Sequence, residues 1–377
     1  MRSPGPTFGV EEEYLLLDAD TGLPAPRARA VQAAADPEPA LGDELDTELL
    51  QAQVEVATPV CGRLDEAVAH LERLRGAVAR AAARVGCRVA ATGGAPLSTG
   101  LAMPVTPQPR YLEMRADAAR LVDEQLINGM HVHIAVPDRD AGAAALAAIR
   151  PWLPVVVALG GNSPFWDGRD TGFASWRTVV FGRWPVSGSP PYTPDADSYE
   201  QRADAVLATG VIPDRHQLYW HARLSESYPT LEVRAPDVQL DAESAVTLAG
   251  LCRALVATAL ADGDRRPPNP PADVMQAASW HAARHGVAGD LVDPRTGKPA
   301  KAAEVAEALL EHVAPALAET GDTERVTGGV DRMLHGGTGA ERQRQAAGEG
   351  GVSGLVDLIS FGGPSRLGGG ENDEVQR

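Results

Sequence analysis

Four short segments that carry acids or histidines limit what this chain can fold into. They lie far apart, at residues 8–14, 48–59, 129–134 and 230–234, and each has the residue pattern of an extended strand. Charged side chains on a buried or cleft-lining face of a strand are costly unless they are paired or bound to metal. Several such strands in one chain therefore predict a polar site built on a sheet, with divalent metal and phosphate as its contents.

Alternation along a strand decides which of these side chains can meet, because residues two apart lie on the same face. Three segments carry such a pair, namely Glu11 with Glu13, His131 with His133, and Glu232 with Arg234. Taken alone, the glutamates could be solvated on an edge strand, and His-x-His is a common coincidence. Acids are poor strand formers, however, and Leu15 and Leu17 continue the same face as the glutamates. This pattern favours a surface that turns inward.

The segment at 48–59 adds two more acids. Glu55 shares a face with Gln53, whereas Glu48 needs a bend before the strand to reach the same site. A mixed set of carboxylates and imidazoles without thiolates suits Mg²⁺ or Mn²⁺ better than structural zinc. Glu232 also stands two residues from Arg234, which places a metal-binding oxygen beside a bidentate phosphate clamp. That pairing indicates nucleotide phosphoryl transfer.

Composition narrows the class of partner. The chain has 377 residues, of which 44% are hydrophobic, and a formal net charge of -17. It can therefore bury a large core and is poorly suited to nucleic acid, so we expect small-molecule partners. The start of the chain lacks the apolar core of a signal peptide, and no run approaches the roughly 20 apolar residues of a membrane span. These features predict a cytoplasmic protein without a membrane partner.

Cysteine and lysine usage exclude two kinds of site. The three scattered cysteines, Cys61, Cys87 and Cys252, predict buried thiols and no disulfide framework. The only lysines are Lys298 and Lys301, and the Gly-Lys-Ser/Thr signature of a P-loop is absent. Arginines and metal must therefore supply the positive charge for any phosphate.

Hydrophobic periodicity gives the order of the elements. Strands are expected at 8–18, 51–58, 87–91, 127–136, 218–223 and 230–234, and helices at 64–85, 110–124, 141–159, 195–208 and 242–261. Pro151 and Pro154 predict a kink or two helices within 141–159. From about residue 272 to 360 the pattern is helical, and the glycine-rich tail 362–377 is expected to be disordered.

This irregular mixture of strands and helices favours an α+β fold with a largely antiparallel sheet over a regular βαβ array. We expect residues 1–361 to form a single domain, with helices on one face of the sheet and the carboxylate face left as a cleft. Two competing signals are weaker. His281 and His285 lack the glutamate of a zinc protease helix and predict a helix surface. Gly93 and Gly94 after a strand predict a backbone turn.

Taken together, the segments resemble the glutamate-cysteine ligase type 2 family of carboxylate-amine ligases, which are related in fold to the catalytic domain of glutamine synthetase. Further matches lie at 163–185, 219–223 and 339–344, so the resemblance extends from Phe8 to about Ile359. It implies a sheet that forms an open funnel or half-barrel with helices packed on its outer face. Two differences, His221 where an acid is expected and the sequence at 235–237, concern the second substrate.

The resemblance also implies roles for individual residues. The implied ligands of a cluster of divalent ions are Glu11, Glu13, Glu48, Glu55, His131 and Glu232. Glu11 and Glu55 are further implied to be catalytic together with Arg234. Arg234 and His133 would bind ATP, and Arg177 would hold a substrate carboxylate.

The implied activity is ATP-dependent ligation. ATP would phosphorylate the γ-carboxylate of L-glutamate, and the amine of cysteine, another amino acid or a small amine would attack the acyl phosphate, releasing ADP and phosphate. The cofactors would be ATP and Mg²⁺, with Mn²⁺ as an alternative, and a homodimer is expected. Two other hypotheses stay open on sequence alone, which are a metal-dependent hydrolase that uses His131 and His133 and a non-catalytic metabolite-binding homologue.

Overall fold

A computed structural model describes residues 5–35, 41, 44–98, 100–263 and 268–362. Their main feature is an eight-stranded sheet in which every strand pair is antiparallel. Its strands are β1 (Phe8–Asp18), β2 (Leu45–Thr47), β3 (Gln53–Ala57), β4 (Cys87–Ala90), β5 (Met130–Ala135), β10 (Ala222–Leu224), β11 (Thr230–Val233) and β14 (Ser360–Phe361). The predicted antiparallel α+β fold is confirmed. The expected disorder of the tail concerns residues beyond Gly362, which lie outside the described ranges.

Strand β1 is the centre of the sheet and contacts three neighbours. β3 pairs along one edge, while β5 and then β4 share the other edge. The register places Glu11 beside His131 and Glu13 beside Glu55. Because β11 continues the sheet beyond β5, Glu232 lies beside His133. The sheet thus collects the four acid- and histidine-bearing segments close together.

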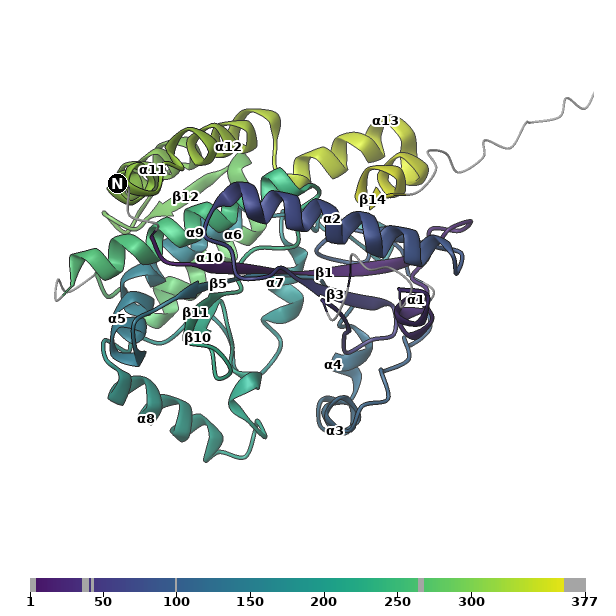
Figure 1. Cartoon of the computed structure of the whole chain (residues 1–377), viewed down its shortest axis with the longest axis horizontal. Helices are drawn as coiled ribbons and strands as arrows, with labels where there is room; N and C mark the ends of the chain where they lie inside the picture. The colour runs from purple at the N-terminus through teal and green to yellow at the C-terminus, as the bar shows by residue number, and fades with distance from the viewer. Residues whose placement is uncertain (1–4, 36–40, 42–43, 99, 264–267, 363–377) are drawn as a thin grey trace, which may run out of the picture.

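Helices α2 (Leu64–Ala83) and α9 (Ala242–Asp262) cover one face of the sheet, and α11 (Ala302–Thr320) and α12 (Thr323–Gly336) pack outside α9 (Figure 1). The remaining helices are α1 (Ala28–Ala35), α3 (Pro109–Ala118), α4 (Arg120–Asp123), α5 (Arg139–Ile149), α6 (Leu153–Leu159), α7 (Trp176–Phe181), α8 (Ala196–Leu207), α10 (Ala272–His285) and α13 (Gly339–Ile359). In Figure 1, α3 and α4 lie on the other side of the sheet from α2, as does α8.

Local sequence explains several element ends. The carboxylate of Glu66 accepts hydrogen bonds from the backbone of Gly62 (2.8 Å) and Arg63 (3.1 Å), which satisfies free N–H groups where α2 begins. Gly86, with a φ of +72°, ends the turn after α2 in a conformation that suits glycine. As the two prolines predict, the apolar run at 141–159 divides into α5, a 3₁₀ turn at Arg150–Trp152, and α6.

Two helical expectations were wrong. The helix expected at 110–124 is interrupted at Ala119, whose φ of +48° separates α3 from α4. The stretch from 272 to 360 is not wholly helical, because β12 (Asp290–Asp293) and β13 (Lys298–Lys301) form a hairpin within it. Asp293 accepts a hydrogen bond from the backbone of Arg295 (2.8 Å), and Gly297 adopts a φ of +68°, so local turn chemistry overrides helix propensity there.

The strand expected at 218–223 is also divided. Its first part, β9 (Tyr219–Trp220), pairs in parallel with β8 (Ser187–Gly188), and only its second part joins the main sheet as β10. A further short pair, β6 (Phe165–Trp166) with β7 (Arg169–Asp170), lies within the segment rich in Gly, Pro and Trp. The partner of β9 comes from a distant segment, and β6 and β7 are only two residues long, so periodicity alone reveals neither pair.

The apolar helices require a further correction. Two stretches, Arg139–Leu159 and Ala242–Asp262, are long and apolar enough by length and composition to cross a membrane. They are 89% and 67% buried inside the fold, as the core helices of a folded protein are. The three cysteines are buried free thiols, as predicted.

Candidate active site

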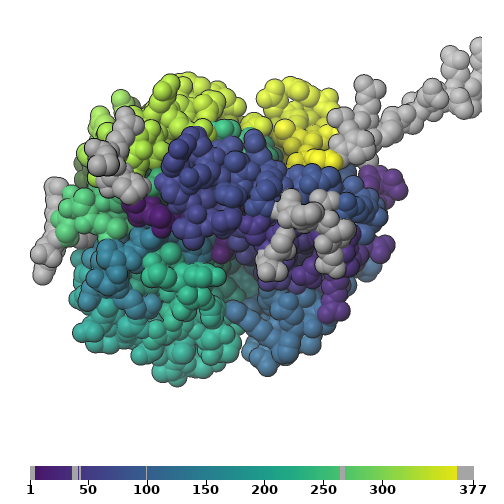
Figure 2. Space-filling model, in the orientation of Figure 1, coloured from purple at the N-terminus to yellow at the C-terminus, as the bar shows by residue number. Residues whose placement is uncertain are grey.

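The sheet face opposite α2 lines a cavity of about 290 Å³, called the central cavity below. In the space-filling view the surface is notched between the blue residues of α3 and α4 and the teal residues that include α8 (Figure 2). All of the residues that sequence analysis assigned to the site line this cavity, and they are Glu11, Glu13, Glu48, Glu55, His131, His133, Arg177, Glu232 and Arg234. The fold therefore brings together, in a single cavity, side chains from segments that are far apart in the sequence.

Strand geometry explains how most of these side chains reach the cavity. Glu11 and Glu13 alternate with Glu12, so they project from the same face of β1. Glu48 follows β2 and precedes a turn at residues 49–52, which is the bend that the sequence analysis required. Arg177 comes from α7, which begins at the N-cap Ser175. Neighbouring strands, one turn and one short helix thus contribute to a single site.

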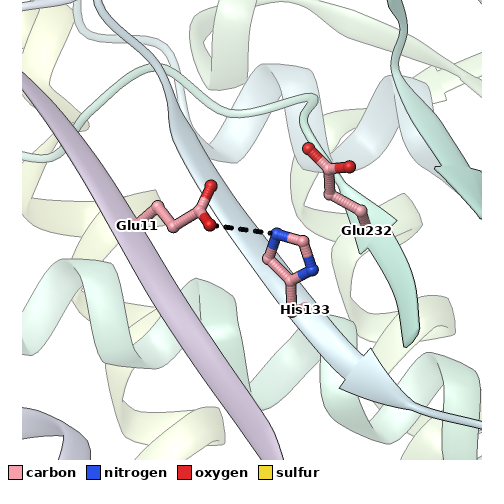
Figure 3. A group of neighbouring side chains, drawn as sticks. All are labelled: Glu11, His133 and Glu232. Carbon is pink, nitrogen blue, oxygen red and sulfur yellow. Dashed lines mark ion pairs between the residues drawn. The ribbon is translucent and has the colours of Figure 1, made fainter. Parts of the chain in front are cut away.

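Glu11 is held between the two histidines of β5. One carboxylate oxygen lies 3.0 Å from Nδ1 of His131. The other lies 3.2 Å from Nε2 of His133, the contact marked by the dashed line in Figure 3. Burial opposes ionisation of Glu11, but the hydrogen bonds with the histidines outweigh it, so the pKa of this carboxyl lies well below its usual range. Burial also acts against a charged His133, yet Glu11 raises the pKa of that imidazole. Glu11 is therefore an anion across the whole neutral pH range.

Glu232 is paired with two arginines. Nε of Arg223 donates to its carboxylate at 2.7 Å, and Nη1 of Arg234 donates to the other oxygen. Burial raises the pKa of Glu232, but the two guanidinium groups outweigh burial and the net pKa lies well below the usual value. Glu232 thus stays ionised, and it lies 4.0 Å from Nδ1 of His131.

Glu13, Glu48 and Glu55 form the other half of the acid set. Burial, followed by repulsion from Glu13, raises the pKa of Glu48 to about 7. Burial and repulsion from Glu11, Glu48 and Glu13 raise the pKa of Glu55 well above 4.5. The backbone N–H of Gly129 donates to Glu13 at 2.5 Å. These carboxylates crowd one another, and a cation between them would relieve their repulsion.

The donor set fits a divalent cation. One ligand atom from each of Glu11, His133 and Glu232 lies within 4.8 Å of the others. Nε2 of His131 is buried without a hydrogen-bond partner among the described residues. Carboxylate oxygens with imidazole and no thiolate suit Mg²⁺ or Mn²⁺. The compact group contains His133, which the resemblance assigned to ATP, in place of His131.

Arg177 is a buried cation that faces the cavity. Its Nη2 donates to the carbonyl of Arg234 at 3.3 Å, and its Nη1 lies 3.9 Å from Asp237. Its Nε has no hydrogen-bond partner among the described residues. A Cβ at Gly129 would lie 2.2 Å from Nη2 of Arg177, so any other residue at this position would force the guanidinium to move. An anionic substrate group could satisfy the free N–H.

Several residues that line the cavity were not identified from the sequence. Arg223 faces Glu232 across the β10–β11 pair, a contact that the register of a predicted hairpin could have shown. An apolar wall contains Tyr111 and Met114, which lie three residues apart on α3, together with Phe181, Trp184 and Tyr219. The spacing of Tyr111 and Met114 was the available signal. Nothing in the sequence linked α3 to the acids.

Three secondary signals have structural explanations. His221 is buried with 4% exposure and does not line the cavity, and burial followed by the charge of Arg177 lowers its pKa to about 4. It is therefore poorly placed to accept a proton from a substrate amine. His281 and His285 lie on α10 with ring centroids 4.5 Å apart. Gly93 is a buried turn residue whose N–H donates to the carbonyl of Asn162 at 2.9 Å.

Comparison with known proteins gives the family. The sequence profile of glutamate-cysteine ligase family 2 matches residues 7–357. The chain belongs to glutamate-cysteine ligase family 2. It is 42% identical over 346 residues to "Putative glutamate--cysteine ligase 2-1" of Nocardia farcinica, with 91% of this chain and 89% of the relative covered. The chain is also 43% identical over 348 residues to "Putative glutamate--cysteine ligase 2-2" of Mycolicibacterium vanbaalenii, with 90% of this chain and 93% of the relative covered.

Solved structures share the fold at low identity. The glutamate-cysteine ligase of Francisella tularensis in complex with AMP has a TM-score of 0.73 and 12% identity, and 95% of this chain and 88% of that chain are covered. A bifunctional glutathione synthetase from Pasteurella multocida has a TM-score of 0.68 and 17% identity, and 94% of this chain and 51% of that chain are covered. Membership of glutamate-cysteine ligase family 2 makes the protein an ATP-dependent carbon-nitrogen ligase with small-molecule substrates.

Proposed function

We propose that this ligase joins the γ-carboxylate of L-glutamate to the amine of cysteine, another amino acid or a small amine. ATP converts the carboxylate to an acyl phosphate, the amine attacks the acyl carbon, and ADP and phosphate leave. The observation that carries the proposal is the convergence of the five predicted glutamates, the two histidines of β5 and two arginines, Arg177 and Arg234, in the central cavity. Such a site can hold a nucleotide, its counter-ions and an anionic substrate together.

Divalent metal, Mg²⁺ or Mn²⁺, is part of this proposal. When bound, such an ion neutralises phosphate charge and orients the transferred group. Glu11, His133 and Glu232 are the compact candidate ligands. Glu13, Glu48, Glu55 and His131 complete the proposed set, since each lines the same cavity. Among them, Glu11 and Glu55 are the glutamates that we propose to be catalytic.

The two arginines have different proposed roles. In this proposal Arg234, which is paired with Glu232, binds ATP phosphate and supplements the metal as charge develops. Arg177, which lines the cavity, is the proposed contact for a substrate carboxylate. The missing side chain of Gly129 leaves space for this guanidinium against the sheet. Together they would fix donor and nucleotide in line for phosphoryl transfer.

The test is an ADP-release screen with Mg-ATP, L-glutamate and a panel of amines, with product masses measured. We expect ADP release that depends on both glutamate and one class of amine, with a product mass equal to glutamate plus amine minus water. Turnover of an amide without nucleotide would favour the hydrolase hypothesis. Ligand binding without ADP release on any amine would favour the non-catalytic homologue. A cytoplasmic location and a homodimer are further proposals, which rest on the sequence analysis.

A further inference from the structure

The face of β1 that turns away from the cavity carries a second ionic contact. Glu12 is fully buried, and Arg75 of α2 reaches it with two hydrogen bonds, from Nε at 2.9 Å and from Nη2 at 2.5 Å. The hydroxyl of Tyr14 donates to the same carboxylate. Helix α2 lies above β1 in Figure 1. Because Glu12 lies between Glu11 and Glu13, this contact fixes the position of β1 from the sheet face opposite the central cavity.

The same guanidinium also holds a second segment of the site. Nη2 of Arg75 donates to the carbonyl of Gln239 at 2.8 Å, and Nη1 donates to the carbonyl of Leu240 at 3.0 Å. These residues follow Asp237, whose carboxylate accepts a hydrogen bond from Ser175 at 2.8 Å and lies 3.9 Å from Arg177. Arg75 therefore connects β1 with the segment at residues 237–240, which contacts Arg177 through Asp237.

Aromatic rings restrict the guanidinium further. The carbon at its centre lies 5.7 Å from the ring centre of Tyr14 and 5.5 Å from that of Phe361. A buried ion pair is often no more stabilising than apolar residues of similar volume. Stability alone therefore gives little reason for this pair, whereas four directional hydrogen bonds to two segments fix their relative position.

We propose that Glu12 and Arg75 are positioning residues that set the distance between β1 and the segment at residues 237–240, which contacts Arg177. They touch no substrate, and they act through the backbone that carries Glu11, Glu13 and Asp237. This inference rests on the proposed function, because it concerns the geometry of the proposed metal and carboxylate subsites. Partners that orient metal ligands typically change affinity by about 10- to 100-fold when they are removed.

The test uses Glu12→Gln and Arg75→Lys in the full chain. Mn²⁺ binding is measured by electron paramagnetic resonance with a non-hydrolysable ATP analogue, below the melting transition of each variant. We expect the Mn²⁺ dissociation constant to rise about 10-fold, and the KM for glutamate to rise with it. Tyr14→Phe removes one donor to Glu12 and keeps the ring over Arg75, so it should fold and show a smaller change in the same direction.

Asp322→Asn is the matched control. It breaks another arginine-carboxylate contact, that of the half-buried Asp322 with the buried Arg253 at 3.2 Å, and neither residue lines the central cavity. Its melting temperature should fall without a change in Mn²⁺ binding. Variants of Glu12 and Arg75 that melt earlier but bind Mn²⁺ and glutamate like the wild type would overturn the positioning role. Wild-type protein that binds no Mn²⁺ would instead overturn the proposed metal site, and with it this inference.

Discussion

The two halves of the acid set differ in what neutralises them. Glu11 and Glu232 lie among histidines and arginines, and the pKa of each is lowered. Glu48 and Glu55 lie among other carboxylates, and the pKa of each is raised. The first half is charge-balanced by the protein itself, whereas the raised pKa values of Glu48 and Glu55 favour their protonated forms, and a bound cation would favour the ionised forms. An active site can thus use one sheet face to hold permanent anions and to attract a counter-ion.

The largest loss of activity should come from substitutions of Glu11 and Glu232, the charge-balanced half of the acid set. Glu11→Gln or Glu232→Gln removes a carboxylate that the histidines or arginines hold ionised, and we expect glutamate-dependent ADP release to fall about 100-fold or more. Steady-state ADP release by the purified variants measures this. Turnover retained in both variants would remove the basis for treating this half as part of the reaction site.

Arg177 tests whether the cavity holds an anionic substrate beside the acids. Arg177→Ala removes a charge-assisted contact of about 1.5–3 kcal/mol, so the KM for glutamate should rise roughly 10- to 100-fold with little change in the KM for ATP. Initial rates at varied glutamate and varied ATP separate the two. An equal rise in both KM values would argue against a dedicated carboxylate contact.

The pH dependence of stability sharpens the comparison in the other half. A carboxyl with a raised folded-state pKa binds a proton in the folded state that the unfolded state has already released. The stability that Glu48 contributes is therefore fully present below pH 4.5 and is lost as pH rises through its folded-state pKa of about 7. Burial is the first cause of this raised pKa and repulsion from Glu13 is the second. As pH rises across this window, the melting temperature of the metal-free wild type should therefore fall relative to that of Glu48→Gln.

Added Mg²⁺ or Mn²⁺ should reverse that trend, because it stabilises the ionised carboxylates. Melting temperatures recorded from pH 4.5 to 8, with and without metal, test this, and Glu48→Gln should flatten the slope. A pH dependence of the melting temperature between pH 4.5 and 7 that is the same in metal-free wild type and in Glu48→Gln would contradict the crowding of these acids.

The smallest effect is expected for Tyr111→Phe. The hydroxyl of Tyr111 donates to Glu48 at 3.4 Å, a long hydrogen bond that helps to hold the ionised form. Its loss should raise the metal concentration for half-maximal activity only about 2- to 5-fold, in line with a net contribution of about 0.5–1 kcal/mol. Met114→Leu, on the same helix, serves as the control because it keeps the volume of the wall.

Much of the site could be predicted because alternation is a local property. Glu11 with Glu13, and His131 with His133, must share a face wherever those residues form strands. The family resemblance then assembled the segments before any register was known. The metal group could not be predicted in the same way, since the imidazole that completes it depends on how β5 pairs with β1 and β11.

The sequence by itself determined the main strands, the faces of their side chains and the excess of acids over lysine and arginine. The tertiary structure alone decided which acids are neutralised. His131 and His133 of β5 pair with Glu11, and Arg223 of β10 joins Arg234 at Glu232, whereas other carboxylates surround Glu48 and Glu55. Charge interactions fall off with distance and strengthen with burial, and both are set by sheet register and packing. Apart from Glu232 and Arg234, which stand two residues apart, no spacing in the linear sequence carries that information.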